Sequence, residues 1–224
     1  MNYYLLFVVP ALLISVIAQI NVQTTFSKYN SYSSLSGYTG AMAARRILDE
    51  NGLQNVEIQR VSGKLTDHFD PRSNVIRLSD STYGSDSVGA IGVAVHEVGH
   101  ALQYQQGYLP IKMRNLLLPV TNLGSQLAFP LAFLGLIMGF DPLVNIGILL
   151  FEAVVAFQLI TLPVEFNASR RALAAIEGSG ILSGDGLDGA KKVLSAAAMT
   201  YVASLIVAMA NLLRLLAMRD RRNR

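Results

Sequence analysis

The sequence predicts a mainly α-helical membrane protein of about four transmembrane helices, with one small α+β region in its polar part. Three observations predict this class. Of the 224 residues, 52% are hydrophobic and only 15% are charged, against roughly 25% charged residues in an ordinary soluble domain. Four stretches stay apolar for about 20 residues or more. A single substantial polar segment lies between the first two of them.

The residue types that are missing or scarce exclude several classes of protein. The chain has no cysteine, which excludes a disulfide framework, a zinc ribbon, a cysteine nucleophile and an iron–sulfur site. The net charge of +3 is modest, and much of the excess lies in Arg219–Arg224, a pattern typical of a membrane flank. We therefore expect a lipid bilayer as a partner, and no nucleic acid.

Each apolar stretch is long enough to cross the hydrocarbon core of a bilayer as a helix. Only the third contains a charged side chain, Glu152. The first could instead be a signal peptide, but no Lys or Arg precedes it, so we predict an anchor. The alternative for the set is that one or more are buried helices of a soluble core. The stretches are Tyr3–Val22, Leu116–Phe140, Pro142–Val164 and Val193–Leu213.

A tight break at Asp141-Pro142 predicts that the second and third stretches form a hairpin. A hairpin returns the chain to the side that it left, so residues 23–115 and 165–192 are expected on one side of the membrane. The predicted organisation is a transmembrane anchor (1–22), an α+β catalytic region (23–115), a transmembrane hairpin (116–164), a helix followed by a Gly/Ser/Asp-rich loop at Gly178–Gly189 (165–192), and a last transmembrane helix with a basic tail (193–224).

The polar segment predicts two helices and two short strands. Apolar residues at helical spacing predict a helix over Gly40–Gly52, and alternation predicts a strand over Val56–Val61. A turn at Asp70–Asn74 precedes a second strand, Val75–Leu78. Ser85–Gln106 is predicted as a helix with Ser85 or Asp86 as its cap.

The last of these helices carries the pattern His-Glu-Val-Gly-His at residues 96–100. Two histidines four residues apart lie on one face of a helix, where both can bind one zinc ion. Glu97 lies beside the first histidine, where it can act as a general base on a water molecule. The chain has only three histidines, and two of them fall in this motif. The alternative is a pair of core histidines with satisfied hydrogen bonds.

A catalytic zinc has three protein ligands and one open position, so a third ligand is needed. Glu165 follows the third apolar stretch and is expected on the same side as His96. His68, just before a turn, and Glu152, within the bilayer by our count, remain alternatives. Of the three, Glu165 is the residue that we predict.

Six segments of the sequence resemble the bacterial membrane-bound zinc metallopeptidases of the YugP type, the neutral zinc metallopeptidase family 2. They occur in order along most of the chain: residues 37–45, 65–71, 75–79, 94–101, 162–172 and 196–203. A more distant similarity is to membrane metallopeptidases of the heat-shock and CAAX type, whose third-ligand motif carries an Asp where this chain has Ser169. Because that Asp orients a metal-bound histidine, the difference puts any transfer of their substrates in doubt.

The family resemblance implies a multi-pass protein of the bacterial cell membrane with a zincin-like catalytic region. It implies one zinc ion per chain, held by His96, His100 and Glu165, and hydrolysis of protein or peptide substrates with Glu97 as general base. His68, Arg171 and Tyr201 are candidates for stabilising the oxyanion of the transition state, each with a structural alternative.

The strand before the motif helix predicts a substrate site, because zincins bind peptides along a sheet edge. It comprises Val75, Ile76, Arg77 and Leu78, and plain sheet packing is the alternative. For the whole protein, two other functions remain open: a membrane scaffold that keeps a structural zinc, and a transporter built around Glu152. A structural zinc site is closed and needs no Glu97.

The distribution of basic residues near the predicted membrane ends favours an active site that faces the cytoplasm. The candidate site's side has Lys28, Lys112, Arg114, Arg170, Arg171, Lys191 and Lys192, and the opposite side has Arg214, Arg219, Arg221, Arg222 and Arg224.

Overall fold

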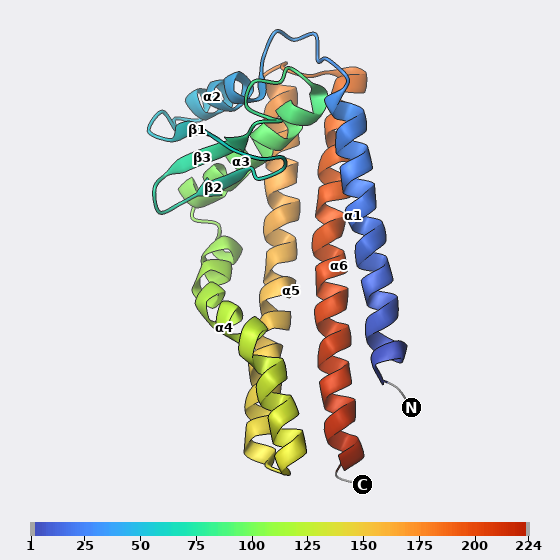
Figure 1. Ribbon diagram of the computed structural model, residues 1–224. Coiled ribbons are helices and arrows are strands. Elements are labelled where there is room, and N and C mark those ends of the chain that lie inside the picture. The colour runs from blue at the N-terminus through green and yellow to red at the C-terminus, as the bar shows by residue number, and fades with distance from the viewer. Residues whose placement is uncertain (1–2, 223–224) are drawn as a thin grey trace. The chain divides into compact units, whose positions relative to one another are not determined.

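The computed structural model describes residues 3–222 and divides the chain into two units. One, here called the membrane unit, contains the described residues up to Gln19, Leu109–Val164 and those from Met199 onward. The other, the sheet unit, contains Ile20–Tyr108 and Glu165–Ala198. Figure 1 labels the helices and strands that build them.

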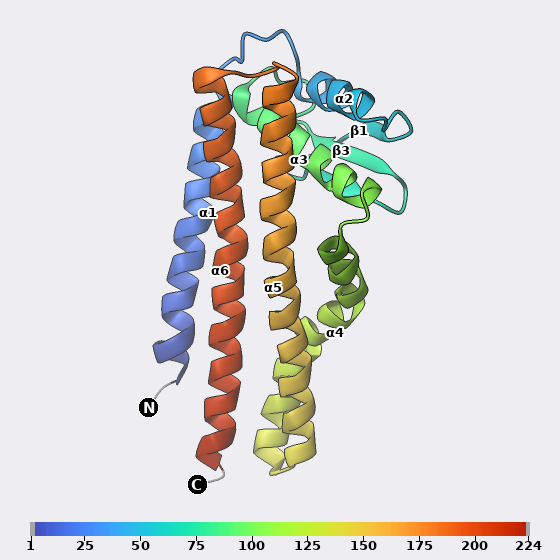
Figure 2. The same cartoon turned by 180° about the vertical axis from the view of Figure 1, so that it is seen from behind.

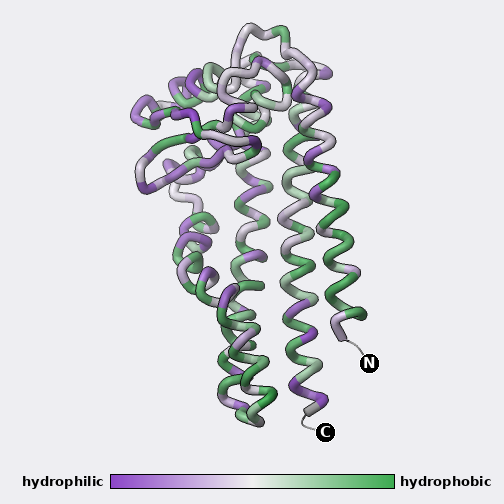
Figure 3. The backbone as a smooth tube through the Cα atoms, viewed as in Figure 1, coloured by the Kyte–Doolittle hydropathy of each residue, from purple (hydrophilic) through white to green (hydrophobic). Residues whose placement is uncertain are grey.

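Four helices among the described residues are long and apolar enough to cross a membrane: Tyr4–Asn30, Leu109–Met138, Asp141–Gly178 and Gly184–Arg221. The first is a π-helical turn, Tyr4–Val8, that continues as α1, Val9–Asn30. The others are α4 (Leu109–Met138), α5 (Asp141–Gly178) and α6 (Gly184–Arg222). Figure 3 shows the apolar residues along these helices and the polar residues gathered over the strands. The prediction of four spans is confirmed.

Within the membrane unit, the end of α4 and the start of α5 form the predicted hairpin (Figure 2). Gly139, at φ +69°, ends α4, and Pro142 lies in the first turn of α5, where its missing N–H costs no helical bond. The helices α4 and α5 approach closely because glycines lie where they touch. A Cβ on Gly147 of α5 would lie 2.6 Å from the carbonyl oxygen of Ala128 on α4.

In the sheet unit, three strands and two helices share one apolar core with the parts of α5 and α6 that belong to this unit. The sheet has the order β1 (Glu57–Val61), β3 (Val75–Ser79), β2 (His68–Asp70), with β1 parallel and β2 antiparallel to β3. Helices α2 (Gly40–Glu50) and α3 (Val88–Gln105) cover it. Their fully buried residues include Ile47, Ile76, Leu78, Ile91 and Val95.

Two local predictions are wrong, and one strand was not predicted. The cap of α3 is Ser87, whose hydroxyl accepts the Ala90 N–H. The two predicted caps have other partners: the Asp86 carboxylate accepts from the Ser33 hydroxyl, and the Ser85 hydroxyl donates to the Ser87 hydroxyl. The strand β2 begins at His68, where only a turn further on was predicted. The loop at Gly178–Gly189 shrinks to residues 179–183, because α6 already begins at Gly184. Inside that helix, Gly189 serves close packing: a Cβ there would lie 2.8 Å from the Tyr29 ring.

Candidate metal centre

The helix α3 carries both histidines on one face, next to a segment of α5. The side chains of His96 and His100 are 15% and 11% exposed, and that of Glu165 is 3% exposed. One carboxylate oxygen of Glu165, Oε2, lies 3.3 Å from His96 Nε2 and 3.5 Å from His100 Nε2. Nearly buried imidazoles therefore converge on a buried carboxylate.

These separations fit a zinc ion. Two ligand atoms that are each about 2.0–2.1 Å from zinc, at a tetrahedral angle, lie about 3.3–3.4 Å apart. Among the described residues, His96, His100 and Glu165 form the group whose ligand atoms all lie within 4.8 Å of one another. The donor set, two neutral nitrogens and one carboxylate, is that of a catalytic zinc site with an open position. The residues present fit the metal.

Gly99 lets α3 and α5 approach closely enough to form this group. A Cβ on Gly99 would collide with the carbonyl oxygen of Ala168 and would lie 3.0 Å from its carbonyl carbon. Ala168 is three residues beyond Glu165 on α5. The small residue between the two histidines therefore sets the distance from the histidines to the carboxylate.

We expect Gly99→Ala to weaken zinc binding and to lower the thermal unfolding temperature. Alanine favours a helix by about 1 kcal/mol over glycine, but overpacking against a backbone costs about 1–3 kcal/mol and separates Glu165 from the histidines. The measurement is zinc affinity and unfolding of the purified variant. Gly178→Ala, where a Cβ meets nothing within 4 Å, is the control. Wild-type zinc affinity in Gly99→Ala would contradict this account of the packing.

Glu97 is buried beside the histidines and held by the sheet. Its Oε2 accepts the backbone N–H of Phe69, on β2, at 2.9 Å. Burial raises the pKa of Glu97 to about 7, with the Glu165 and Asp67 carboxylates adding to the rise, while His96 and the Phe69 N–H oppose it. A carboxyl group with a pKa near neutrality can both accept and return a proton.

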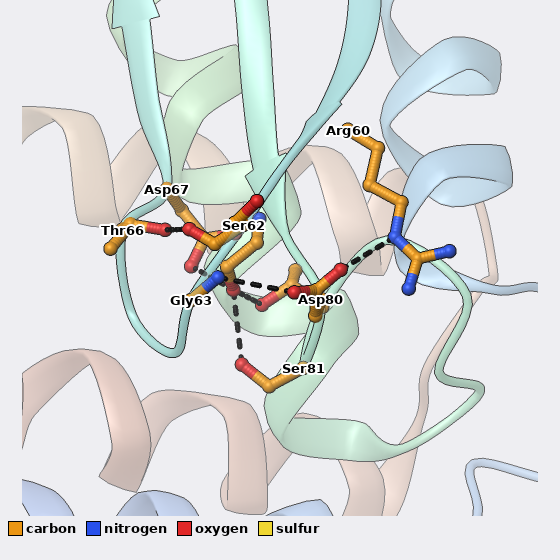
Figure 4. Close-up of polar contacts among 9 residues, drawn as sticks. Arg60, Ser62, Gly63, Thr66, Asp67, Asp80 and Ser81 are labelled. Atoms are coloured by element: carbon orange, nitrogen blue, oxygen red, sulfur yellow. Dashed lines mark hydrogen bonds and ion pairs between the residues drawn. The ribbon is translucent and has the colours of Figure 1, made fainter.

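The loop before β2 is tied down by a polar network (Figure 4). Asp67 accepts from the backbone N–H of Ser79 at 2.8 Å and from its hydroxyl at 2.9 Å. Asp80 accepts from Arg60 Nε at 2.7 Å and from the N–H of Gly63 at 3.1 Å. Both ends of the loop are therefore fixed to the end of β3, which positions the Phe69 N–H against Glu97.

The other two candidates for the third ligand lie elsewhere. His68 is on β2, with its Nδ1 2.9 Å from the Thr66 carbonyl oxygen. Strand alternation puts it on the face opposite Phe69, whose ring packs on Tyr104 of α3. Glu152 belongs to the membrane unit. Of the three candidates, Glu165 is the one that lies against both histidines.

The oxyanion candidates have different surroundings. Arg171 donates through Nε to Asn167 Oδ1 at 2.6 Å and through a terminal nitrogen to Gln106, and its guanidinium lies 5.9 Å from the centre of the Tyr108 ring. Both of these hydrogen bonds are to neutral amide side chains. Tyr201 belongs to the membrane unit. The catalytic roles of His68, Arg171 and Tyr201 stay predictions.

Each of the two histidines has a partner on the ring nitrogen that does not face Glu165. His96 Nδ1 lies 3.2 Å from the Ser169 hydroxyl, and His100 Nδ1 lies 3.1 Å from Gln103 Oε1. Ser169 thus occupies the place of the Asp in the more distant metallopeptidases as a neutral partner. Sequence reasoning missed Gln103, although its position three residues after His100, on the same helix face, could have indicated it.

The strand β3, which was expected to bind the substrate, does not have the free edge that such binding requires. β3 is the central strand: Val75–Ser79 pair with β1, and Val75–Arg77 pair with β2. The assignment of Val75, Ile76, Arg77 and Leu78 to an edge is wrong, since a short strand that sequence alone did not show covers it. The edge strand that contacts α3 through Glu97 is β2.

Comparisons with known proteins agree with this geometry. The family model described as "Putative neutral zinc metallopeptidase" matches residues 4–220. The chain is 49% identical over 212 residues, 94% of each chain, to the protein named "Putative membrane protease YugP" of Bacillus subtilis (strain 168). No solved structure matches the chain. A match over nearly the whole length, around a site whose donor set fits zinc, identifies the chain as a member of the neutral zinc metallopeptidase family and as a relative of a bacterial membrane protease.

Proposed function

We propose that this protein is an integral membrane zinc endopeptidase in which His96, His100 and Glu165 hold one zinc ion and Glu97 is the general base. The observation that carries the proposal is the convergence of three ligand atoms within 4.8 Å, with a second buried carboxyl group beside them. A closed structural site would need a fourth ligand and would not need Glu97, so the scaffold alternative is weaker.

The residues of the site suggest which step the metal would assist and which step the protein would perform. When bound, zinc supplies Lewis-acid polarisation and lowers the pKa of a water molecule to about 7. Glu97 takes a proton from the attacking water and returns it to the leaving amine. Because its Oε2 is engaged by the Phe69 N–H, we assign the proton transfer to Oε1. Burial keeps bulk water from competing for this proton.

We place the peptide substrate along β2 rather than along β3. β2 is an edge strand, and its Phe69 contacts the general base. An extended peptide beside an edge strand gains affinity from main-chain hydrogen bonds, and pockets for its alternate side chains give specificity. His68, on the same strand, is then close to the substrate, which keeps it a candidate for contact with the reacting carbonyl.

We propose that the site faces the cytoplasm, as the positive-inside rule favours. Since the chain has no cysteine, Leu35→Cys, at a position in the sheet unit that is 92% exposed, introduces a single thiol. A membrane-impermeant maleimide should leave it unlabelled in intact cells and label it after the membrane is opened. Labelling in intact cells would contradict this orientation.

The function is tested by cleavage of an unfolded protein in detergent or lipid. A strong zinc chelator should stop the cleavage, and stoichiometric zinc should restore it. If no substrate in a broad panel is cleaved by fully zinc-loaded protein, the scaffold with a structural zinc becomes the better account.

A further inference from the structure

We propose that Arg171, Asn167 and Gln103 form a directional hydrogen-bond chain that fixes the tautomer and the ring orientation of His100, so that Nε2 presents a lone pair to the metal. The inference rests on the proposed zinc ligands. It makes these three residues positioning residues that act through His100. Arg171 thereby receives a role other than the oxyanion contact considered for it.

The chain of contacts is continuous and runs between two helices. Arg171 Nε lies 2.6 Å from Asn167 Oδ1, and Gln103 Nε2 lies 3.0 Å from the same oxygen. Gln103 Oε1 lies 3.1 Å from His100 Nδ1. Gln103 and His100 are on α3, whereas Asn167 and Arg171 are on α5, so the chain also joins the two elements that carry the ligands.

The direction of every bond follows from Arg171, because a guanidinium can only donate. Its Nε–H therefore requires an acceptor, which fixes the amide of Asn167 with its oxygen toward Arg171. That oxygen also faces Gln103, so Gln103 must turn its NH₂ group toward it. The carbonyl oxygen of Gln103 is then left for His100, whose Nδ1 must carry the proton.

A neutral imidazole protonated at Nδ1 has its lone pair at Nε2, the atom that lies 3.5 Å from Glu165. Gln103 is 0% exposed, so water does not compete with this arrangement, and reversing the amide would place two donors, or two acceptors, face to face without solvent. Arg171 is itself held by Gln106 and by the Tyr108 ring. The starting point of the chain is therefore fixed in place.

His96 differs from His100 in this respect. Its Nδ1 faces the Ser169 hydroxyl, which can donate or accept and so imposes no direction. The structure thus assigns the fixed tautomer to His100 and leaves His96 adaptable. We expect zinc affinity to depend more on the Gln103 chain than on Ser169.

The experiment measures zinc affinity of the purified full chain by competition with a chromophoric chelator. Asn167→Leu and Arg171→Met remove the acceptor and the donor, and each should weaken binding about 10- to 100-fold, the usual effect of losing an outer partner of a ligand. Asn167→Asp can accept from both neighbours and Arg171→Lys can still donate, so each should bind zinc more tightly than its apolar counterpart. Asn167→Asp should stay within about threefold of wild type.

Arg170→Met is the matched control, since Arg170 is an exposed neighbour on the same helix and its loss causes the same change of charge. Its zinc affinity should equal that of wild type. Helical content and unfolding of the metal-free variants, compared with wild type, show which variants fold, and the comparison of Asn167→Asp with Asn167→Leu is made between folded proteins. If Asn167→Leu is unfolded, Asn167→Asp is compared with Asn167→Ala instead. The comparison of Arg171→Met with Arg171→Lys provides the same test at the other end of the chain.

The outcomes separate this inference from the proposed function. Wild-type affinity in Asn167→Leu and Arg171→Met, or equal weakening in Arg170→Met, overturns the directional chain while zinc binding by the wild type stands. Equal weakening in Asn167→Asp and Asn167→Leu also overturns it, because a role in packing alone would not distinguish an acceptor from an apolar side chain of similar size. If the wild type itself binds no zinc, the proposed ligand set fails instead.

Discussion

Glu97→Gln is expected to abolish peptide-bond cleavage while leaving zinc bound and the fold intact. Glutamine has almost the shape of glutamate, and its amide oxygen can still accept the Phe69 N–H that now reaches Glu97 Oε2. It cannot take a proton from water, however. General acid–base catalysis contributes about 10²- to 10⁴-fold, so we expect activity to fall by at least this range.

The assay compares wild type and Glu97→Gln on one substrate, with zinc content measured in both preparations. Glu57→Gln, on the exposed strand β1, is a matched control for the loss of a carboxylate in the sheet unit and should cleave as wild type does. Equal cleavage by wild type and Glu97→Gln would refute the role assigned to Glu97. Loss of zinc from Glu97→Gln would show instead that Glu97 supports the metal.

Glu165→Ala is expected to remove most of the zinc, whereas Glu152→Ala should leave it bound. Both residues lie on α5, but only the Glu165 carboxylate lies within 3.5 Å of both His96 and His100. Removing a ligand should cost more than the roughly 10- to 100-fold that losing an outer partner costs. The same competition measurement checks this.

His68→Ala completes the comparison, because His68 was the remaining alternative for the third ligand. Its Nδ1 lies against the Thr66 carbonyl, so we expect the variant to keep its zinc. If His68→Ala loses the metal and Glu165→Ala retains it, the assignment of the third ligand is wrong.

Much of the site was predictable because it depends on local spacing. The four-residue separation of His96 and His100 needs only a helix, and the apolar lengths need only a bilayer. Glu165 needed one further step, the return of the chain through a hairpin. These features follow from short-range geometry, and the structure reproduces that geometry.

The features that sequence reasoning missed depend on tertiary contacts. The three residues of β2 are too few to show alternation, and they form a strand because β3 offers them an edge. That pairing removes the free edge expected at Val75–Leu78. Glycine was taken as a sign of a loop at residues 178–189, whereas Gly189 lies inside α6 and allows close approach to Tyr29.

The contacts around the ligands were hidden for the same reason. Gln103 and Asn167 are 64 residues apart in sequence, and neither has a residue type that alone indicates a role at a metal. Only the approach of α3 and α5 at Gly99 brings them together. The residues that we propose to orient His100 are therefore harder to find from one sequence than the proposed ligand itself.

The central claim, one zinc ion held by His96, His100 and Glu165, is tested most directly by crystallography of the full chain at the zinc absorption edge. The account predicts one anomalous peak per chain, about 2.0–2.2 Å from His96 Nε2, His100 Nε2 and a Glu165 oxygen, with Glu97 close by but not bound to the metal. A peak ligated by His68 in place of Glu165, or no peak in protein purified without chelators, would contradict it.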